Sequence, residues 1–283
     1  MKNLFLATYV LIGFLRNKDI AIGEKIPFIL LYFYDMGINI ASKNKLKVVH
    51  FFKMRKFLYF GNHNNLLLDH IHSNLTHYSY FYKKADVVLD VGASFGSFAL
   101  MVNYCNPKAK IFSFEPSKES FDILKKNCYN IKNVELIESA VGSVNKSVNF
   151  YHDKDYPEGS HISTQDTNQS SLTYQVEQIT LDSFVKKKKI KKISLLKIDT
   201  EGYESQVLKG GINALAISES LIVETDVNLI DNLINVLNYL RRYNFTFVRI
   251  GTINYHKNGN IGSLDLIFLK NHKILNSGLL NLI

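Results

Sequence analysis

The segment 88–96 reads Val-Leu-Asp-Val-Gly-Ala-Ser-Phe-Gly, and it decides the fold class. The compact apolar run at 85–91 is typical of a buried strand, and apolar residues at helical spacing follow at 95–104. Gly92 lets the chain turn and pass close to a ligand, and Gly96 lets a helix begin near the strand. The segment therefore predicts a strand, a tight turn and a helix whose first N–H groups can meet an anion.

Strands and helices alternate from this segment onward. Further strands are expected at 110–115, 134–137 (continuing into 140–141), 193–198, 220–224, 245–250 and 264–269, and helices at 117–129, 203–209 and 229–239. This alternation predicts an α/β fold with a mostly parallel sheet and helices on both faces. The turn Asn258-Gly259-Asn260 joins the last two strands tightly, so they are expected to form a C-terminal antiparallel hairpin.

Two regions depart from the alternation. Residues 1–85 are expected to form an N-terminal extension of helices and short strands, with the α/β domain at 86–283. The stretch 147–179 is predicted to be a hairpin with a long polar loop, and long loops in enzymes often cover a substrate. His161 lies in this loop and is a substrate-binding candidate, with a solvent-exposed histidine as the alternative.

Composition excludes several classes of protein. With 46% hydrophobic and 21% charged residues in a chain of 283, a folded globular protein is expected. Cys105 and Cys128 are too few for a disulfide framework or a zinc cluster, which favours a reducing, cytoplasmic location.

The net charge of +9 favours anionic partners. Six lysines lie within 186–192, where a solvated helix end or loop is expected. No zinc-finger or RNA-binding aromatic signature accompanies this charge, so nucleic acid is a disfavoured partner.

The apolar stretches 1–15 and 26–40 are shorter than the roughly 20 residues that a membrane-spanning helix needs. We expect them to pack on the domain or on a partner. The alternative is peripheral membrane contact through residues 1–40, which would make the protein membrane-associated.

Three ligands use a glycine turn of this kind. A nucleoside triphosphate site would have a lysine after Gly96, and a dinucleotide site would have glycine where Ser94 stands. S-adenosyl-L-methionine has no pyrophosphate and needs fewer glycines. Its amino and carboxylate ends suit the acidic strand end at Asp90 and the turn through Gly92, Ala93 and Ser94.

Glu115 ends the second strand, 25 residues after Asp90. A carboxylate there can accept hydrogen bonds from both ribose hydroxyls of a nucleoside cofactor, while Pro116 fixes the turn that follows. The third strand ends at Glu138, Ser139 and Ala140, which are candidates for contact with adenine. An ordinary strand exit is an equal alternative for these three.

The fourth parallel strand leads into Lys197-Ile198-Asp199-Thr200-Glu201-Gly202. Two carboxylates two residues apart at a strand end are unusual, because burying unpaired charge is costly. Gly202 permits a tight turn into the next helix. An acceptor would meet a methyl donor at this position.

Six short motifs occur in this order along the chain. They are Val-Leu-Asp-Val-Gly-Ala (88–93), Phe-Glu-Pro (114–116), Leu-x-x-Asn (124–127), Leu-Asp (181–182), Leu-Lys-Ile-Asp-x-Glu-Gly (196–202) and Ile-Val-Glu (222–224). Over roughly residues 86 to 226 the chain resembles the FkbM family of S-adenosyl-L-methionine-dependent methyltransferases. The resemblance implies the seven-stranded, Rossmann-like sheet of class I methyltransferases and methyl transfer to a hydroxyl, often of a sugar or glycan.

A sugar hydroxyl is a poor acid, so a nearby base should help the transfer. Asp199 and Glu201 are the catalytic candidates, although Asp199 can instead order its loop or orient the methionine end of the cofactor. Glu224 is a substrate-binding candidate at the end of the fifth strand. The two acids could also hold Mg²⁺, but no other feature calls for a metal and none is expected.

Other functions stay open at this point. One is methylation of a different small metabolite. The others are not enzymatic: a cofactor-binding interaction protein and a membrane-recruited protein.

Overall fold

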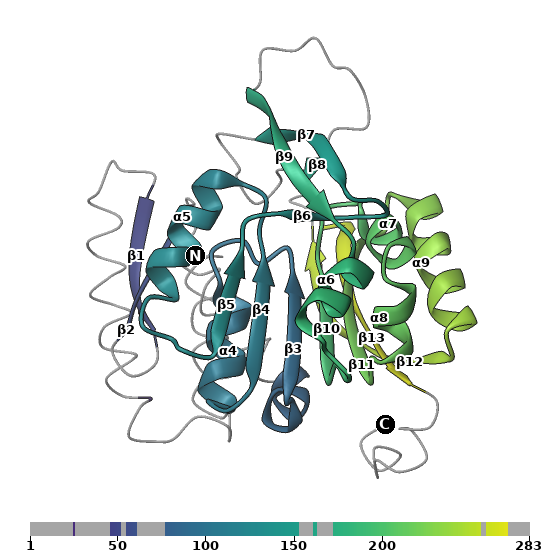
Figure 1. Cartoon of the computed structure of the whole chain (residues 1–283), viewed down its shortest axis with the longest axis horizontal. Helices are drawn as coiled ribbons and strands as arrows, with labels where there is room; N and C mark the ends of the chain where they lie inside the picture. Colours follow the sequence, from purple (N-terminus) through teal and green to yellow (C-terminus); the bar gives the residue numbers. More distant parts are fainter. Residues whose placement is uncertain are drawn as a thin grey trace.

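The computed structural model describes residue 25 and residues 46–51, 55–60, 77–152, 161–162, 172–255 and 259–270. Its centre is a seven-stranded sheet in the order β12-β13-β11-β10-β3-β4-β5 (Figure 1). The strands are β3 (Val87–Val91), β4 (Lys110–Phe114), β5 (Val134–Ile137), β10 (Leu195–Ile198), β11 (Ser220–Asp226), β12 (Phe245–Tyr255) and β13 (Ile261–Lys270). All neighbours are parallel except β13, which runs antiparallel to β11 and β12. The predicted class I methyltransferase sheet and its C-terminal hairpin are confirmed.

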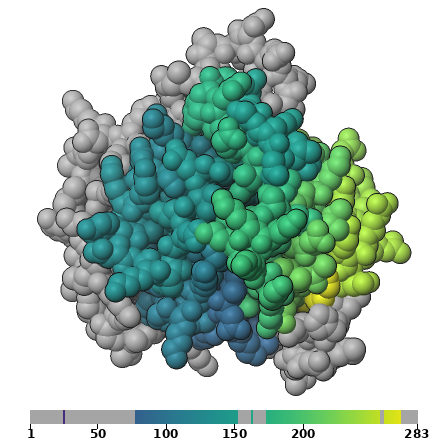
Figure 2. Space-filling view, in the orientation of Figure 1, coloured from purple at the N-terminus to yellow at the C-terminus, as the bar shows by residue number. Residues whose placement is uncertain are grey.

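Helices cover both faces of this sheet. They are α4 (Ser97–Cys105), α5 (Lys118–Asn127), α6 (Leu181–Lys188), α7 (Glu204–Lys209), α8 (Ile212–Ala216) and α9 (Ile230–Arg242). One apolar core lies between the sheet and a helical stretch at 77–84 together with α4 and α5. The other lies between the sheet and α6 to α9. In the space-filling view the half built from α4 to β5 directly abuts the half built from α6 to β13 (Figure 2).

The alternation of side chains along β3 explains why this strand is central. Val88 joins the first core and Leu89 the second, and both are fully buried. A strand with both faces covered reads as a continuous apolar run, which is the pattern seen at 85–91. Because the strand order reverses between β3 and β10, the carboxyl ends of these two strands mark the place where open sheets bind ligands.

A second, four-stranded sheet has the order β6-β9-β7-β8. Its strands are β6 (Ala140–Val141), β7 (Lys146–His152), β8 (His161–Ile162) and β9 (Leu172–Ile179), and Figure 1 shows them beyond the carboxyl ends of β3, β4 and β5. The predicted hairpin at 147–179 is confirmed, since β7 and β9 pair antiparallel. Its loops at 153–160 and 163–171 lie outside the described residues.

The continuation of the third strand into 140–141 was wrong. Ala140 pairs with Gln178 of β9, so β6 belongs to the second sheet. The chain bends at Ser139, whose backbone N–H donates to Ile137 O, two residues back. The hydrogen bonds between β4 and β5 cannot continue through such a bend. Ala140 and Val141, which follow it, are buried as part of the second sheet.

Residues before the expected domain boundary contribute to the first core. In the helical stretch 77–84, Tyr78 and Tyr82 are 2% and 0% exposed, which places this helix under the sheet. Farther upstream, β1 (Leu46–Phe51) and β2 (Arg55–Phe60) form an antiparallel hairpin. The division between residues 85 and 86 stays a prediction.

The apolar stretches 1–15 and 26–40 lie outside the described residues. Within the part of the chain that the structure describes, no helix is both long and apolar enough to cross a bilayer.

Candidate active site

The ends of three parallel strands are joined by backbone hydrogen bonds. The N–H of Gly92 donates to Phe114 O at the end of β4, and the N–H of Asp199 donates to Val91 O at the end of β3, both at 3.0 Å. Gly92 has φ +79°, and a Cβ on it would lie 1.7 Å from Asp199 O. Only glycine permits so close an approach of the β3 and β10 loops.

Glu115, at the end of β4, is held by two backbone donors. Oε2 accepts from the N–H of Ser94 and Oε1 from the N–H of Ser117, each at 2.8 Å. Burial raises the pKa of Glu115 to about 7, and the two N–H donors oppose that rise. Each oxygen retains lone-pair capacity for one further donor, which is what the two hydroxyls of a ribose would need.

Lys197, to which the sequence analysis gave no role, lies between two of the predicted acids. Lys197 Nζ is 2.9 Å from Asp199 Oδ2 and 3.8 Å from Asp90 Oδ1, and it also donates to Gly92 O at 3.3 Å. Burial lowers the pKa of Lys197, but the carboxylates of Asp199 and Asp90 offset this and raise it overall. Strand alternation was the available signal, since Lys197 of β10 and Asp199, directly after the strand, are two positions apart and are expected on one face.

Asp90, near the end of β3, is fully buried. Its Oδ2 accepts from Ser113 Oγ at 3.1 Å, while Oδ1 accepts no hydrogen bond from the described residues. Burial raises its pKa to about 6, and Lys197 and Ser113 oppose the rise. Asp90 therefore needs Lys197 as its counter-charge.

The turn after β10 is organised by Glu204, which sequence reasoning missed. Glu204 Oε1 accepts from the N–H groups of Thr200 and Gly202 and from Thr200 Oγ1, all at 3.0 Å, and Oε2 accepts from Asn232 Nδ2 at 2.6 Å. Glu204 is 1% exposed, whereas Glu201 is exposed, with φ +51°. Asp199 and Glu201 thus lie in different settings: the former in an ion pair, the latter on the outer side of a tight turn.

The remaining predicted residues are more spread out. Glu138 is exposed, Ser139 and Pro116 are half-buried, and Ala140 is buried in β6. Glu224 is half-buried in β11 beside Asp199, whose charge is the first cause of its raised pKa. His161 lies in β8, where the structure describes its backbone only, so its role stays a prediction.

Two of the sequence motifs have structural explanations. Gly96 begins α4 with φ +89°, and a Cβ there would lie 2.5 Å from Leu124 Cδ1 of α5. Asn127 Nδ2 donates to Phe95 O at 2.8 Å, so the Leu-x-x-Asn motif fastens α5 to the glycine turn. Asp182 accepts from the N–H of Ala214 and from Asn213 Nδ2, both at 2.9 Å, and so ties α6 to α8.

Residues 90–247 match the methyltransferase FkbM domain. The chain belongs to the FkbM methyltransferase family. The predicted family and the methyltransferase class are confirmed by this match, and so is S-adenosyl-L-methionine as the cofactor.

Two relatives and one solved structure illustrate the similarity of this FkbM domain to known proteins. It is 32% identical over 141 residues to hexuronic acid methyltransferase AglP of Haloferax volcanii, covering 49% of this chain and 55% of that protein. It is 28% identical over 155 residues to 2-O-methyltransferase NoeI of Sinorhizobium fredii, covering 50% of this chain and 64% of that protein. The match spans less than two thirds of either relative. An O-methyltransferase of Bacillus cereus in complex with SAH aligns with a TM-score of 0.44 and 13% identity over 87% of this chain and 93% of that one.

The side chains of the FkbM site fit S-adenosyl-L-methionine. The buried Ser94 Oγ has no hydrogen-bond partner among the described residues, and Ser94 has φ +47° in the turn where the cofactor's methionine end is expected. Glu115 offers two oxygens for the ribose, and no side chain caps the start of α4. These groups suit a ligand that carries a diol, an ammonium and a carboxylate.

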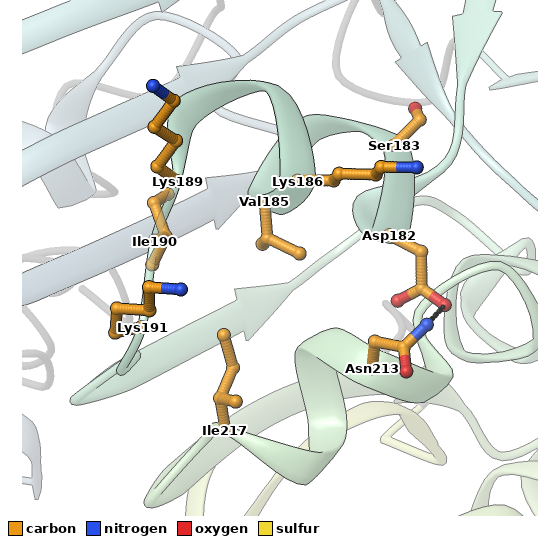
Figure 3. Close-up of a pocket in the computed structure, with 9 residues that line it drawn as sticks. All are labelled: Asp182, Ser183, Val185, Lys186, Lys189, Ile190, Lys191, Asn213 and Ile217. Atoms are coloured by element: carbon orange, nitrogen blue, oxygen red, sulfur yellow. Dashed lines mark hydrogen bonds between the residues drawn. The ribbon is translucent and has the colours of Figure 1, made fainter.

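A cavity of about 540 Å³ lies apart from these residues. It is formed by α6, the segment leading to β10, and the region of α8, and its rim carries Lys186, Lys189 and Lys191 (Figure 3). None of the predicted site residues lines it. The lysine cluster is the exposed end of α6, as expected, with Lys189 as its left-handed C-cap.

Among the described residues, no group of three His, Cys, Asp or Glu side chains is placed to hold a metal ion.

Proposed function

We propose that the protein is an S-adenosyl-L-methionine-dependent O-methyltransferase that acts on a hydroxyl of a sugar or glycan. The observation that carries this proposal is the joining of Glu115, Ser94, Asp199 and Lys197 at the carboxyl edge of an FkbM domain. The named activities of two relatives support the acceptor class: one acts on a hexuronic acid and the other is a 2-O-methyltransferase.

Each residue has a distinct task in this proposal. Glu115 accepts the ribose hydroxyls, while the turn at Gly92 to Gly96 receives the methionine carboxylate. Asp199, held by Lys197, faces the ammonium of the methionine end. When bound, the cofactor supplies a methyl group on a sulfonium cation, which needs little further activation. The chain's contribution is alignment of the acceptor and exclusion of water.

Acceptor selection falls to the parts of the chain outside the motifs that form the cofactor site. The second sheet lies beyond the carboxyl ends of β3 to β5 (Figure 1). Its strand β8 contains the predicted substrate residue His161. We therefore place the acceptor between this sheet and the β10–β11 strand ends, with Glu224 among its contacts.

The test is a transfer assay with purified protein. Radiolabelled S-adenosyl-L-methionine is supplied with neutral sugars, with hexuronic acids and with small phenols, and the methylated products are identified by mass spectrometry. Ether-linked methyl groups on a sugar support the proposal. Methylation of phenols alone, or of the carboxyl group of the hexuronic acid, would overturn the acceptor class.

A further inference from the structure

Three carboxylates lie side by side at the carboxyl edge of the sheet. Ile198 of β10 pairs with Val223 of β11, so the residues that follow, Asp199 and Glu224, are neighbours across parallel strands. Glu224 is in turn directly opposite Asp265 of β13. Neighbouring strands lie about 5 Å apart, so the middle carboxylate, Glu224, is within electrostatic reach of the other two.

Glu224 is oriented by the C-terminal hairpin. Its Oε1 accepts from Ser263 Oγ at 2.5 Å and from Asn254 Nδ2 at 3.2 Å. Among the described residues, no donor contacts Oε2, and the side chain is only half-buried. One oxygen of Glu224 is therefore fixed by β12 and β13, and the other is available to a ligand.

The neighbouring acids are engaged in other contacts. Asp199 is paired with Lys197 at 2.9 Å, and Asp265 accepts a hydrogen bond from the hydroxyl of Tyr78. The same hydroxyl accepts from the N–H of Thr252 at 3.1 Å. Glu201 is exposed, in the turn that Glu204 holds. Asp199 also has an oxygen that accepts no hydrogen bond from the described residues, but its charge is paired with Lys197, whereas the groups that hold Glu224 are neutral.

We propose that Glu224 is the proton acceptor of the methyl transfer, with Asn254 and Ser263 as its positioning residues. This inference rests on the proposed function. The acceptor oxygen forms a bond to the methyl carbon, the carbon–sulfur bond breaks with its electron pair passing to sulfur, and the hydroxyl proton moves to Glu224 Oε2. The Asp199–Lys197 pair stays on the cofactor side of this step.

The charges around Glu224 suit a base. The carboxylate of Asp199 and burial raise the pKa of Glu224 well above its usual value, Asp265 adds to the rise, and Ser263 and Lys197 oppose it. The hydroxyl of Tyr78 donates to Asp265, the neighbour of Glu224 on β13. A carboxylate with a raised pKa takes a hydroxyl proton more readily, but it is available only when the pH exceeds that pKa.

The experiment measures kcat against pH for the full chain and for Glu224→Gln, Asp199→Asn and the control Glu177→Gln, which removes an exposed carboxylate of β9. We expect kcat of the unsubstituted protein to rise with pH, and Glu224→Gln to lower kcat about 100-fold or more while donor affinity changes less than about twofold. In Asp199→Asn the rising limb should move to lower pH, because the adjacent negative charge is gone. Full kcat in Glu224→Gln, or an unmoved limb in Asp199→Asn, overturns the proposal.

A second readout needs no turnover. In protein labelled with ¹³C at glutamate carboxyls, the resonance lost in Glu224→Gln identifies Glu224, and its pKa should fall in Asp199→Asn. An unchanged pKa means that the two carboxylates are not coupled and overturns the proposal. If the unsubstituted protein methylates no sugar, the proposed function fails. If it does so and Glu224→Gln is equally active, only the assignment of Glu224 fails.

Discussion

The backbone N–H of Ser94 donates a 2.8 Å hydrogen bond to Oε2 of Glu115. This bond joins the glycine turn after β3 to the end of β4, so the two parts of the cofactor site are fixed to each other. Glu115 is 7% exposed and receives a second backbone donor from Ser117. Its carboxylate is thus held in one orientation before any ligand arrives.

Removing this carboxylate should weaken donor binding. In Glu115→Ala, two ribose hydrogen bonds to a charged group are lost, at about 1.5–3 kcal/mol each, so donor affinity should fall about 100-fold or more. Isothermal titration calorimetry measures the change, with the exposed Glu177→Ala as control. Unchanged affinity in Glu115→Ala would contradict the ribose assignment.

Donor affinity should also depend on pH. The ribose hydroxyls favour the deprotonated carboxylate, and the pKa of unliganded Glu115 is raised to about 7. Affinity should therefore be full above that pH and fall as the pH drops through it, by up to about tenfold per pH unit. Titrations between about pH 6 and pH 8 test this, and in Glu115→Gln the slope should disappear. A slope that persists in Glu115→Gln would point to another group.

Lys197 is predicted to be a large contributor to folding stability. In Lys197→Met the fully buried Asp90 loses its counter-charge, which should cost about 3–5 kcal/mol of unfolding free energy near pH 8. Without Lys197 the already raised pKa of Asp90 rises further. Because a carboxyl with a raised folded pKa destabilises the fold only when it is ionised, the loss should shrink as the pH falls below that pKa. Urea unfolding at two pH values measures it, and a loss that is equal at both would argue against the pairing.

The turn after β10 is predicted to depend on Glu204. Glu204→Ala leaves the N–H groups of Thr200 and Gly202 without their acceptor, at a cost of about 1 kcal/mol for each of these half-buried groups. The melting temperature should fall, and donor affinity should fall with it because Asp199 begins this turn. Glu201→Ala, at an exposed position of the same turn, is the matched control and should leave the melting temperature nearly unchanged.

The N-terminal limit of the domain can be tested by truncation. A chain beginning at residue 77 keeps Tyr78 and Tyr82 in the core, and it should fold and bind the donor. A chain beginning at residue 86 loses both rings and the contact between Tyr78 and Asp265, and it should be markedly less stable. Equal stability of the two chains would favour a boundary at residue 86.

Much of the fold could be predicted because its signals are local. The apolar run ending at Asp90, the turn through Gly92 and Gly96, and the spacing to Glu115 each depend on a few adjacent residues. Ser117 caps α5 through Ser120 N, as the sequence indicates. The C-terminal hairpin follows in the same way from alternating apolar residues on either side of Gly259.

The features that sequence reasoning missed depend on contacts between distant segments. Ala140 pairs with Gln178 of another sheet, and no local pattern distinguishes this from a longer third strand. From the sequence, Glu204 is indistinguishable from a solvent-exposed acid in the first turn of a helix. Its burial depends on contacts with Asn232 and with the preceding turn. Lys197 lies within a sequence motif, but its role as the counter-charge of Asp90 could not be predicted, because Asp90 is on a different strand.

The most direct test of the central claim is calorimetric titration of the full chain with S-adenosyl-L-methionine, NAD and ATP, repeated with Glu115→Ala. We predict selective binding of S-adenosyl-L-methionine that is strongly weakened in Glu115→Ala. Absence of binding, or equal affinity for NAD, would contradict the assignment of this edge of the sheet as a methyl-donor site.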